Sequence, residues 1–226
     1  MRVKLDILAL VLGGLGIVGL IAITAMPLWR VSAFIGANLI VMEDQWEGLW
    51  MNCIKQIDRM QCKVYDSLLI LPVELQAARG LVCASIVLAL VAFVITVVGT
   101  KVTACCDDSP EAKMTTLAIG GCIFLLACLT TMIPVCWVAH TVIRDFYNPT
   151  LVDAQRRELG TALYVGWATA GILLATGVIL LLRFCQRRGK REGGDYPGAY
   201  ALAPSAADSV YLQRAPSTTH KAMEYV

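Results

Sequence analysis

The sequence predicts an α-helical membrane protein: a left-handed four-transmembrane-helix bundle with a small extracellular antiparallel β-sheet. Of the 226 residues, 58% are hydrophobic and 16% are charged, and the mean hydropathy is +0.67, a composition typical of integral membrane proteins. Four apolar runs are long enough to cross a hydrocarbon core of about 30 Å. The segment between the first two runs is rich in β-prone residues and contains a close pair of cysteines.

The apolar runs divide the chain into spans and connecting segments. A short cytosolic amino terminus, 1–6, comes first. The spans are expected at 7–27, 73–99, 114–139 and 159–182, joined by a first extracellular loop at 28–72, a cytosolic loop at 100–113 and a second extracellular loop at 140–158. Residues 183–226 form a cytosolic tail without apolar periodicity, which predicts disorder.

The first apolar run has a second interpretation. Arg2 and Lys4 precede it and small residues follow it, as in a cleaved signal peptide. Signal peptides have apolar cores of about 7–15 residues, and this run is longer, so a retained helix is favoured. Gly13, Gly16 and Gly19 lie on one side of that helix and would permit a neighbouring helix to approach closely.

The first loop is expected to fold as a small sheet. Strands are expected at 29–35, 39–41, 46–53 and 62–66, with a turn near Asp58–Arg59. Cys53 and Cys62 are nine positions apart between β-prone residues, a spacing that suits a disulfide across a hairpin. Two free thiols in a cytosolic loop are the alternative, because a disulfide requires an oxidising compartment.

The placement of Lys and Arg predicts the orientation. Nine basic residues lie close to the spans in the amino terminus, the 100–113 loop and the start of the tail. By the positive-inside rule, both termini are therefore expected in the cytosol. The loop that contains the two cysteines is then extracellular, which agrees with a disulfide.

Several function classes are disfavoured by the composition. The net charge is +2, and the scattered basic residues form no nucleic-acid-binding face. The sequence has two histidines, no Cys-x-x-Cys pair, no glycine-rich phosphate loop and no cluster of metal ligands, so no enzyme activity, metal or cofactor is predicted. The apolar parts of the spans carry no Asp, Glu, Lys or Arg, whereas transporters normally have such groups at membrane depth.

A set of motifs resembles the claudin family. Its W…GLW…C…C pattern is matched by Trp29, Gly48, Leu49, Trp50, Cys53 and Cys62. The likeness covers about residues 1–185 and includes Gln76–Arg79, Arg144–Pro149 and Arg157–Trp167. Gly-Leu-Trp alone would also admit the wider superfamily of epithelial membrane proteins and calcium-channel γ-like subunits.

The resemblance implies a tight-junction protein of the plasma membrane. Its partners would be other claudins, with which it assembles side by side and across cells into strands that seal or selectively conduct the paracellular space. The Gly-Leu-Trp segment would plug the outer mouth of the helix bundle. The alternative is an accessory subunit that modulates a membrane channel, although such relatives commonly carry a first-loop glycosylation site that this chain lacks.

The resemblance also assigns a role in charge selectivity to Lys63, directly after the second cysteine. Lys55 and Arg59 are expected to add positive potential to the same rim. These charges predict a barrier to cations with weak anion permeability, since a fixed cation acts over about 8 Å at physiological salt. The loop as a whole is nearly neutral, and Glu47, Asp58 and Asp66 oppose the effect.

The resemblance also predicts how neighbouring copies assemble and what the cytosolic side binds. In the family a hydrophobic residue of one copy, here Leu68, docks near Phe146, Tyr147 and Leu159 of its neighbour; packing of these aromatic residues within one subunit is the alternative. The terminal Tyr225-Val226 resembles a claudin terminus and suits capture by a PDZ scaffold domain. Three cysteines expected at the cytosolic face of the membrane are candidates for palmitoylation, which would add contact with membrane lipid: Cys105, Cys106 and Cys185.

The sequence departs from the family pattern at two places. The Cys53–Cys62 spacing is one residue shorter than usual in the family, so the tip of the hairpin is expected to differ. The residues after Asn148-Pro149 are Thr150–Val152 rather than the commoner run, so binding of bacterial enterotoxin is not expected.

Overall fold

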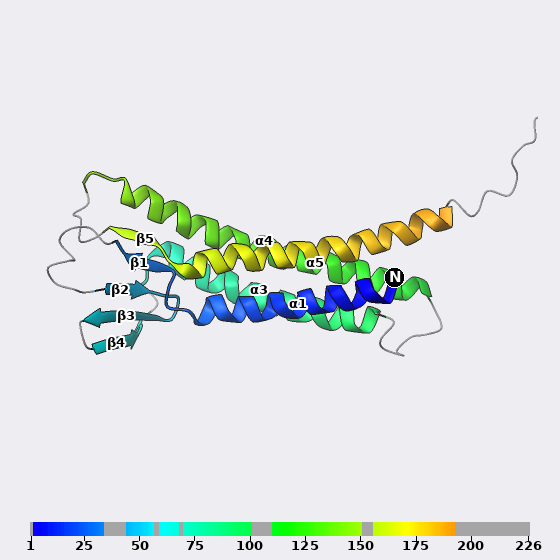
Figure 1. Ribbon diagram of the computed structural model, residues 1–226, viewed down its shortest axis with the longest axis horizontal. Coiled ribbons are helices and arrows are strands. Elements are labelled where there is room, and N and C mark those ends of the chain that lie inside the picture. The colour runs from blue at the N-terminus through cyan, green and yellow to red at the C-terminus, as the bar shows by residue number, and fades with distance from the viewer. Residues whose placement is uncertain are drawn as a thin grey trace, which may run out of the picture.

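The computed structural model describes residues 2–33, 44–56, 59–67, 70–100, 110–150 and 156–192. Within these ranges the chain forms four long helices and five short strands. The helices are α1 (Arg2–Ala25), α3 (Val73–Gly99), α4 (Pro110–Phe146) and α5 (Thr161–Glu192). The strands gather at one end of the bundle, here called the sheet end, and the start of α1 and the end of α5 lie at the opposite, far end (Figure 1).

All four helices are long and apolar enough to cross a membrane. Even the shortest apolar segment, the 22 residues of Lys4–Ala25, spans about 33 Å at 1.5 Å per residue, compared with a hydrocarbon core of about 30 Å. A helix satisfies its backbone N–H and C=O groups internally, as lipid requires. The predicted fold class, with four such helices and a small antiparallel sheet, is confirmed.

The helices extend beyond the predicted spans. Helix α1 begins at Arg2 rather than at residue 7, and α4 continues through Pro134 to Phe146, so the first part of the expected second loop is helical. Helix α5 begins two residues later than predicted and continues to Glu192, into the expected disordered tail. Hydropathy marks only the apolar part of a helix, whereas Arg, Lys, Gln and Glu also have good helix propensity and allow it to continue.

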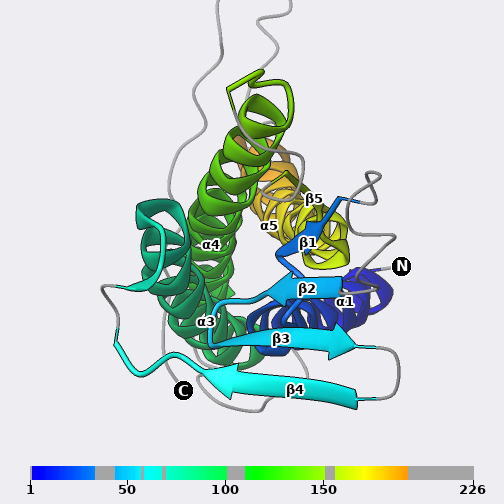
Figure 2. The same cartoon turned by 90° about the vertical axis from the view of Figure 1, so that its left-hand side faces the viewer.

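The four helices close into a ring. Helix α1 packs against α3 and α5, and α4 packs against the same two helices, as the view from the sheet end shows (Figure 2). The contact between α1 and α5 is close, because a Cβ added to Gly19 would lie 2.4 Å from Thr169 Oγ1 and one added to Gly16 would lie 2.7 Å from Leu173 Cδ2. Small residues therefore bring the first and last helices together.

The sheet is antiparallel throughout and has the order β4-β3-β2-β1-β5. Its strands are β1 (Arg30–Ser32), β2 (Asp44–Glu47), β3 (Met51–Gln56), β4 (Arg59–Val64) and β5 (Arg157–Leu159). Strands β3 and β4 lie on the side of α1 and α3 (Figures 1 and 2).

One strand was not predicted, and two predictions within the first loop need correction. Strand β5 comes from the second loop, where three residues are too few for a recognisable alternation in sequence. The expected strand 46–53 is interrupted at Gly48–Trp50, and the two parts are β2 and β3. Arg59 belongs to β4 and pairs with Gln56, so it is not part of the turn. The expected strand 39–41 lies outside the described residues.

A buried ion pair joins the first and last helices at the far end. Asp6 Oδ1 of α1 lies 2.8 Å from Arg183 Nη1 of α5, and both side chains are buried. Asp6 and Arg183 were expected just outside the spans, because an isolated charge at the end of an apolar run is normally solvated. In the fold the helices extend far enough for the two charges to meet between them.

We expect the protein to lose stability when one member of this pair is replaced, but to keep most of it when both are replaced by apolar residues. Arg183→Met leaves the Asp6 carboxylate buried opposite an apolar side chain, and breaking a buried pair costs about 3–5 kcal/mol. The double variant Asp6→Leu/Arg183→Met removes both charges and should recover most of that loss. Thermal unfolding in detergent measures both effects. A single variant as stable as the parent would show that the pair contributes nothing.

Candidate functional site at the sheet end

Trp29 anchors the sheet to the helix bundle. Its side chain is fully buried, and its indole Nε1–H donates a 2.8 Å hydrogen bond to the Ile23 carbonyl at the end of α1. Its backbone N–H donates to the Glu47 carbonyl of β2 at 2.9 Å. Leu49 is also buried, at 1% exposure. Two of the family-motif residues therefore close the sheet end of the bundle.

Two glycines permit the backbones to meet at this point. A Cβ added to Gly160, which links β5 to α5, would lie 1.8 Å from the Leu28 carbonyl oxygen, and one added to Gly48 would lie 2.4 Å from Pro27 Cα. The Gly160 N–H donates to the Trp29 carbonyl at 3.2 Å. No larger residue fits at either position without moving the backbone.

Arg79 of α3 holds the Gly-Leu-Trp segment in place. Its Nε–H donates to the Leu49 carbonyl at 2.9 Å, and its guanidinium carbon lies 4.5 Å from the centre of the Trp50 ring. Trp50 itself is 38% exposed. Arg79 was noted as part of a family-like motif, but no role was predicted for it. Its position, as a lone basic residue at the start of an apolar run, is the feature of the sequence that could have indicated a specific partner.

Two further ion pairs hold the sheet, one to the helix α3 and one between its own strands. Arg30 of β1 pairs with Glu74 at the start of α3, and both are largely buried. Arg157 of β5 lies 3.1 Å from the Glu47 carboxylate and donates to Gln45 Oε1 at 2.7 Å, so it joins β5 to β2. These pairs were not predicted, since their residues lie far apart in the chain.

The disulfide joins Cys53 of β3 to Cys62 of β4, which are direct partners in the strand register, with an S–S distance of 2.02 Å. It ties the edge strand β4, whose residues are all exposed, to a strand that is partly buried. The expected pairing is thereby confirmed, and the alternative of two free thiols is wrong.

The register separates the three predicted selectivity residues. Side chains alternate between the faces of a strand, so Arg59 and Lys63 of β4 share one face. Lys55 is the direct partner of Met60 and therefore lies on the opposite face, which corrects the expectation of one shared rim. The Lys63 ammonium lies 2.7 Å from Asp66 Oδ2, and this hydrogen bond, with the charge of Asp66, raises the pKa of Lys63.

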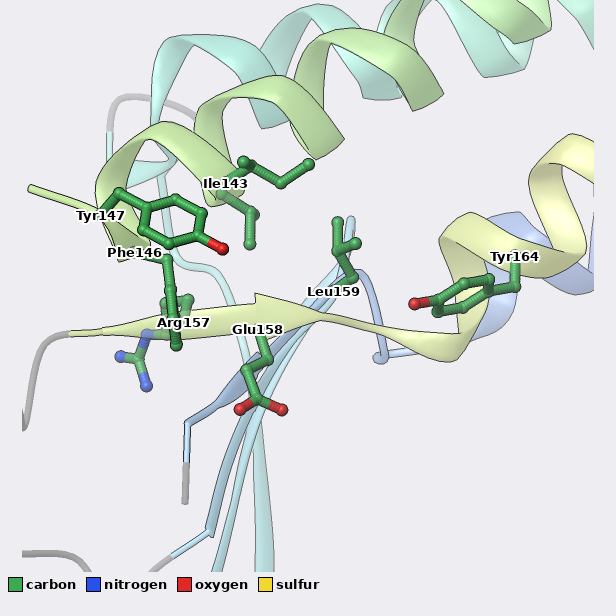
Figure 3. Close-up of a pocket in the computed structure, with 8 residues that line it drawn as sticks. Ile143, Phe146, Tyr147, Arg157, Glu158, Leu159 and Tyr164 are labelled. Atoms are coloured by element: carbon green, nitrogen blue, oxygen red, sulfur yellow. The ribbon is translucent and has the colours of Figure 1, made fainter. Parts of the chain in front are cut away.

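A groove of about 400 Å³ opens between the end of α4, β5 and the start of α5 (Figure 3). It brings together three residues predicted from the sequence, Phe146, Tyr147 and Leu159, and the rings of Tyr147 and Tyr164 point toward one another across Leu159. Lining residues that the prediction omitted are Val142, Ile143, Arg157, Glu158 and Tyr164. Their omission follows from the missed strand β5 and the underestimated length of α4.

Of the remaining predicted site residues, the structure describes only Cys185. Cys185 is a free, exposed cysteine of α5. The described ranges contain no group of three His, Cys, Asp or Glu side chains arranged to hold a metal ion. Leu68, Cys105, Cys106, Tyr225 and Val226 lie outside the described residues.

Comparison with known proteins identifies relatives over most of the chain. A model of the PMP-22/EMP/MP20/Claudin family matches residues 3–180. The chain is 54% identical to claudin-8 of Mus musculus over 182 residues, which are 80% of this chain and 81% of the relative. It is 46% identical to claudin-4 of Homo sapiens over 209 residues, 92% and 98% of the two chains. Identity to claudin-17 of Sus scrofa is 48% over 201 residues, 88% and 89% of the two chains.

Removal of the disulfide should loosen the sheet. In the chain-entropy model a loop of this size contributes about 2.5–3 kcal/mol, so Cys53→Ser should lower the thermal unfolding temperature in detergent. Cys122→Ser, at a free and exposed cysteine of α4, is the matched control and should unfold like the parent. Equal unfolding temperatures for the two variants would mean that the bridge does not stabilise the fold.

Proposed function

The chain belongs to the PMP-22/EMP/MP20/Claudin family, and from this premise we propose that it is a strand-forming protein of the tight junction. Copies assemble side by side in one membrane and across the space between two cells, alone or with other claudins, and the strands form a paracellular barrier. Its role is structural rather than enzymatic. The sheet end faces the extracellular space and both termini lie in the cytosol, a topology supported by the disulfide and by the basic residues of the far end.

The observation that carries the proposal is the groove beside β5. Three of its side chains, Tyr147, Tyr164 and Ile143, are 78%, 55% and 47% exposed. Exposed aromatic and aliphatic side chains gathered around one groove, with charged residues beside them, are typical of an interaction site. The groove lies where α4 and α5 meet the sheet, rather than along the middle of the helices. We therefore do not expect lipid tails to fill it.

The proposed occupant is a second copy of the chain. Ile70, which is 64% exposed, lies shortly before α3, whereas the groove is lined by α4, β5 and α5. Leu68 is two positions before Ile70 in the sequence. A contact between two different surfaces of the same protein is heterologous and extends into open filaments unless the rotation closes it. Docking of Leu68 against Phe146, Tyr147 and Leu159 of the neighbour is therefore suited to a strand.

The barrier is proposed to exclude cations, with weak anion permeability. Lys63 and Arg59 share one face of the exposed strand β4, and a fixed positive charge repels cations over about 8 Å at physiological salt. Lys55 belongs to the opposite face and is not included in this proposal.

The cytosolic side is proposed to connect the strands to other components of the junction. The carboxylate and small apolar side chain of Val226, with Tyr225 before it, suit a PDZ scaffold domain. Cys105, Cys106 and Cys185 lie close in sequence to the ends of the helices, where palmitoylation would add contact with membrane lipid.

A cell that has no tight-junction strands provides the direct test. In fibroblasts expressing the chain, we expect it to concentrate at cell contacts and to form intramembrane strands visible by freeze-fracture. Diffuse distribution over the surface without strands would contradict the proposal and favour an accessory channel subunit.

The same cells test the groove. The double variant Leu68→Ala/Phe146→Ala should reach the surface but form sparse or no strands, because both sides of the proposed contact lose their apolar contact area. Trp137→Ala is the matched control, since Trp137 is 45% exposed on α4 and does not line the groove. Unaltered strands in the double variant would exclude the groove as the lateral contact.

A further inference from the structure

The strand register gives the sheet one face on which polar residues predominate, here called the polar face, with Ile54 between Gln45 and Gln61. Direct partners across four strands place Arg30, Glu47, Asn52 and Lys63 in one row. Side chains two positions along the strands lie on the same face, which adds Gln45, Gln61 and Arg59. The opposite face is mostly apolar and holds Val31, Trp46, Met51, Met60, Val64 and the disulfide, with the charged Asp44 and Lys55 paired at its hairpin end. An aqueous ion path along the sheet would therefore follow the face that contains Lys63.

Each charge in the row of the polar face has an opposite charge beside it. Arg30 pairs with Glu74, and Glu47 lies 3.1 Å from Arg157. Lys63, at the edge strand, lies 2.7 Å from Asp66 Oδ2, with both side chains largely exposed. At distances much larger than their separation, two opposite charges act as a dipole, whose field falls off faster than that of a single charge.

We infer that Asp66 is a specificity-determining residue, because its carboxylate offsets the charge of Lys63 on the polar face and weakens the preference that Lys63 alone would impose. This inference rests on the proposed paracellular barrier. Arg59, roughly 13 Å farther along β4, shares the face, and no ion pair in the described part of the chain includes it. The positive potential is then concentrated toward the hairpin end of the sheet, and the row through Lys63 is nearly neutral.

Dilution potentials across epithelial monolayers test this with a charge cycle. Asp66→Asn keeps the shape of the side chain and removes its charge, so the sodium-to-chloride permeability ratio should fall by about twofold, the scale of one unit charge acting across a Debye length of water. Lys63→Gln should raise the ratio by a similar factor. The double variant, which is again neutral at this position, should match the parent.

Lys55→Gln is the matched control, because it removes the same charge from the opposite face of the neighbouring strand. Its ratio should equal that of the parent; a shift as large as that of Lys63→Gln would overturn the inference in favour of the net charge of the loop. If Lys63→Gln shifts the ratio while Asp66→Asn does not, Lys63 acts alone and the inference is wrong. If all variants form strands and none changes the ratio, the polar face lines no ion path. Both the proposed charge barrier and this inference would then be wrong.

Discussion

The junction between the sheet and the helix bundle is the constraint on which the rest of the structure depends. Buried backbone N–H and C=O groups must be paired, and here the chain passes twice between helix and strand in a small space. The Ala162 N–H donates to the Leu28 carbonyl at 3.1 Å, and the Gly160 N–H donates to the Trp29 carbonyl at 3.2 Å. These bonds connect the segment after α1 to the start of α5, and the Trp29 side chain is fully buried.

This junction also couples the two proposed functional surfaces. Strand β5 contributes Arg157, Glu158 and Leu159 to the groove and forms one edge of the sheet. Strand β4, with Lys63, forms the other edge. Because β5 pairs with β1, and β1 continues directly from the Trp29 anchor, the contact between neighbouring copies and the charged face that they would line are positioned by the same few hydrogen bonds.

The sequence was sufficient for features that depend on local pattern or on a family motif. The four helices follow from hydropathy, and the Cys53–Cys62 bridge follows from spacing between β-prone residues. Features formed by distant residues were missed. Strand β5 exists because three residues pair with β1, and the Asp6–Arg183 pair exists because the first and last helices are neighbours. Lys55 was expected at the same rim as Lys63, although the disulfide itself indicates otherwise. Lys55 is two residues from Cys53 and Lys63 is one residue from Cys62, so alternation along the paired strands puts their side chains on opposite faces.

Hydrogen exchange of the whole protein in detergent, measured by mass spectrometry with residue-level fragmentation, tests the central role of the junction most directly. We expect the backbone amides of Trp29, Gly160 and Ala162 to exchange as slowly as those in the middle of the helices, because their opening requires separation of the sheet from the bundle. The amides of the exposed edge strand β4 should exchange faster. If the three junction amides exchange as fast as those of β4, the sheet moves independently of the bundle and the account is contradicted.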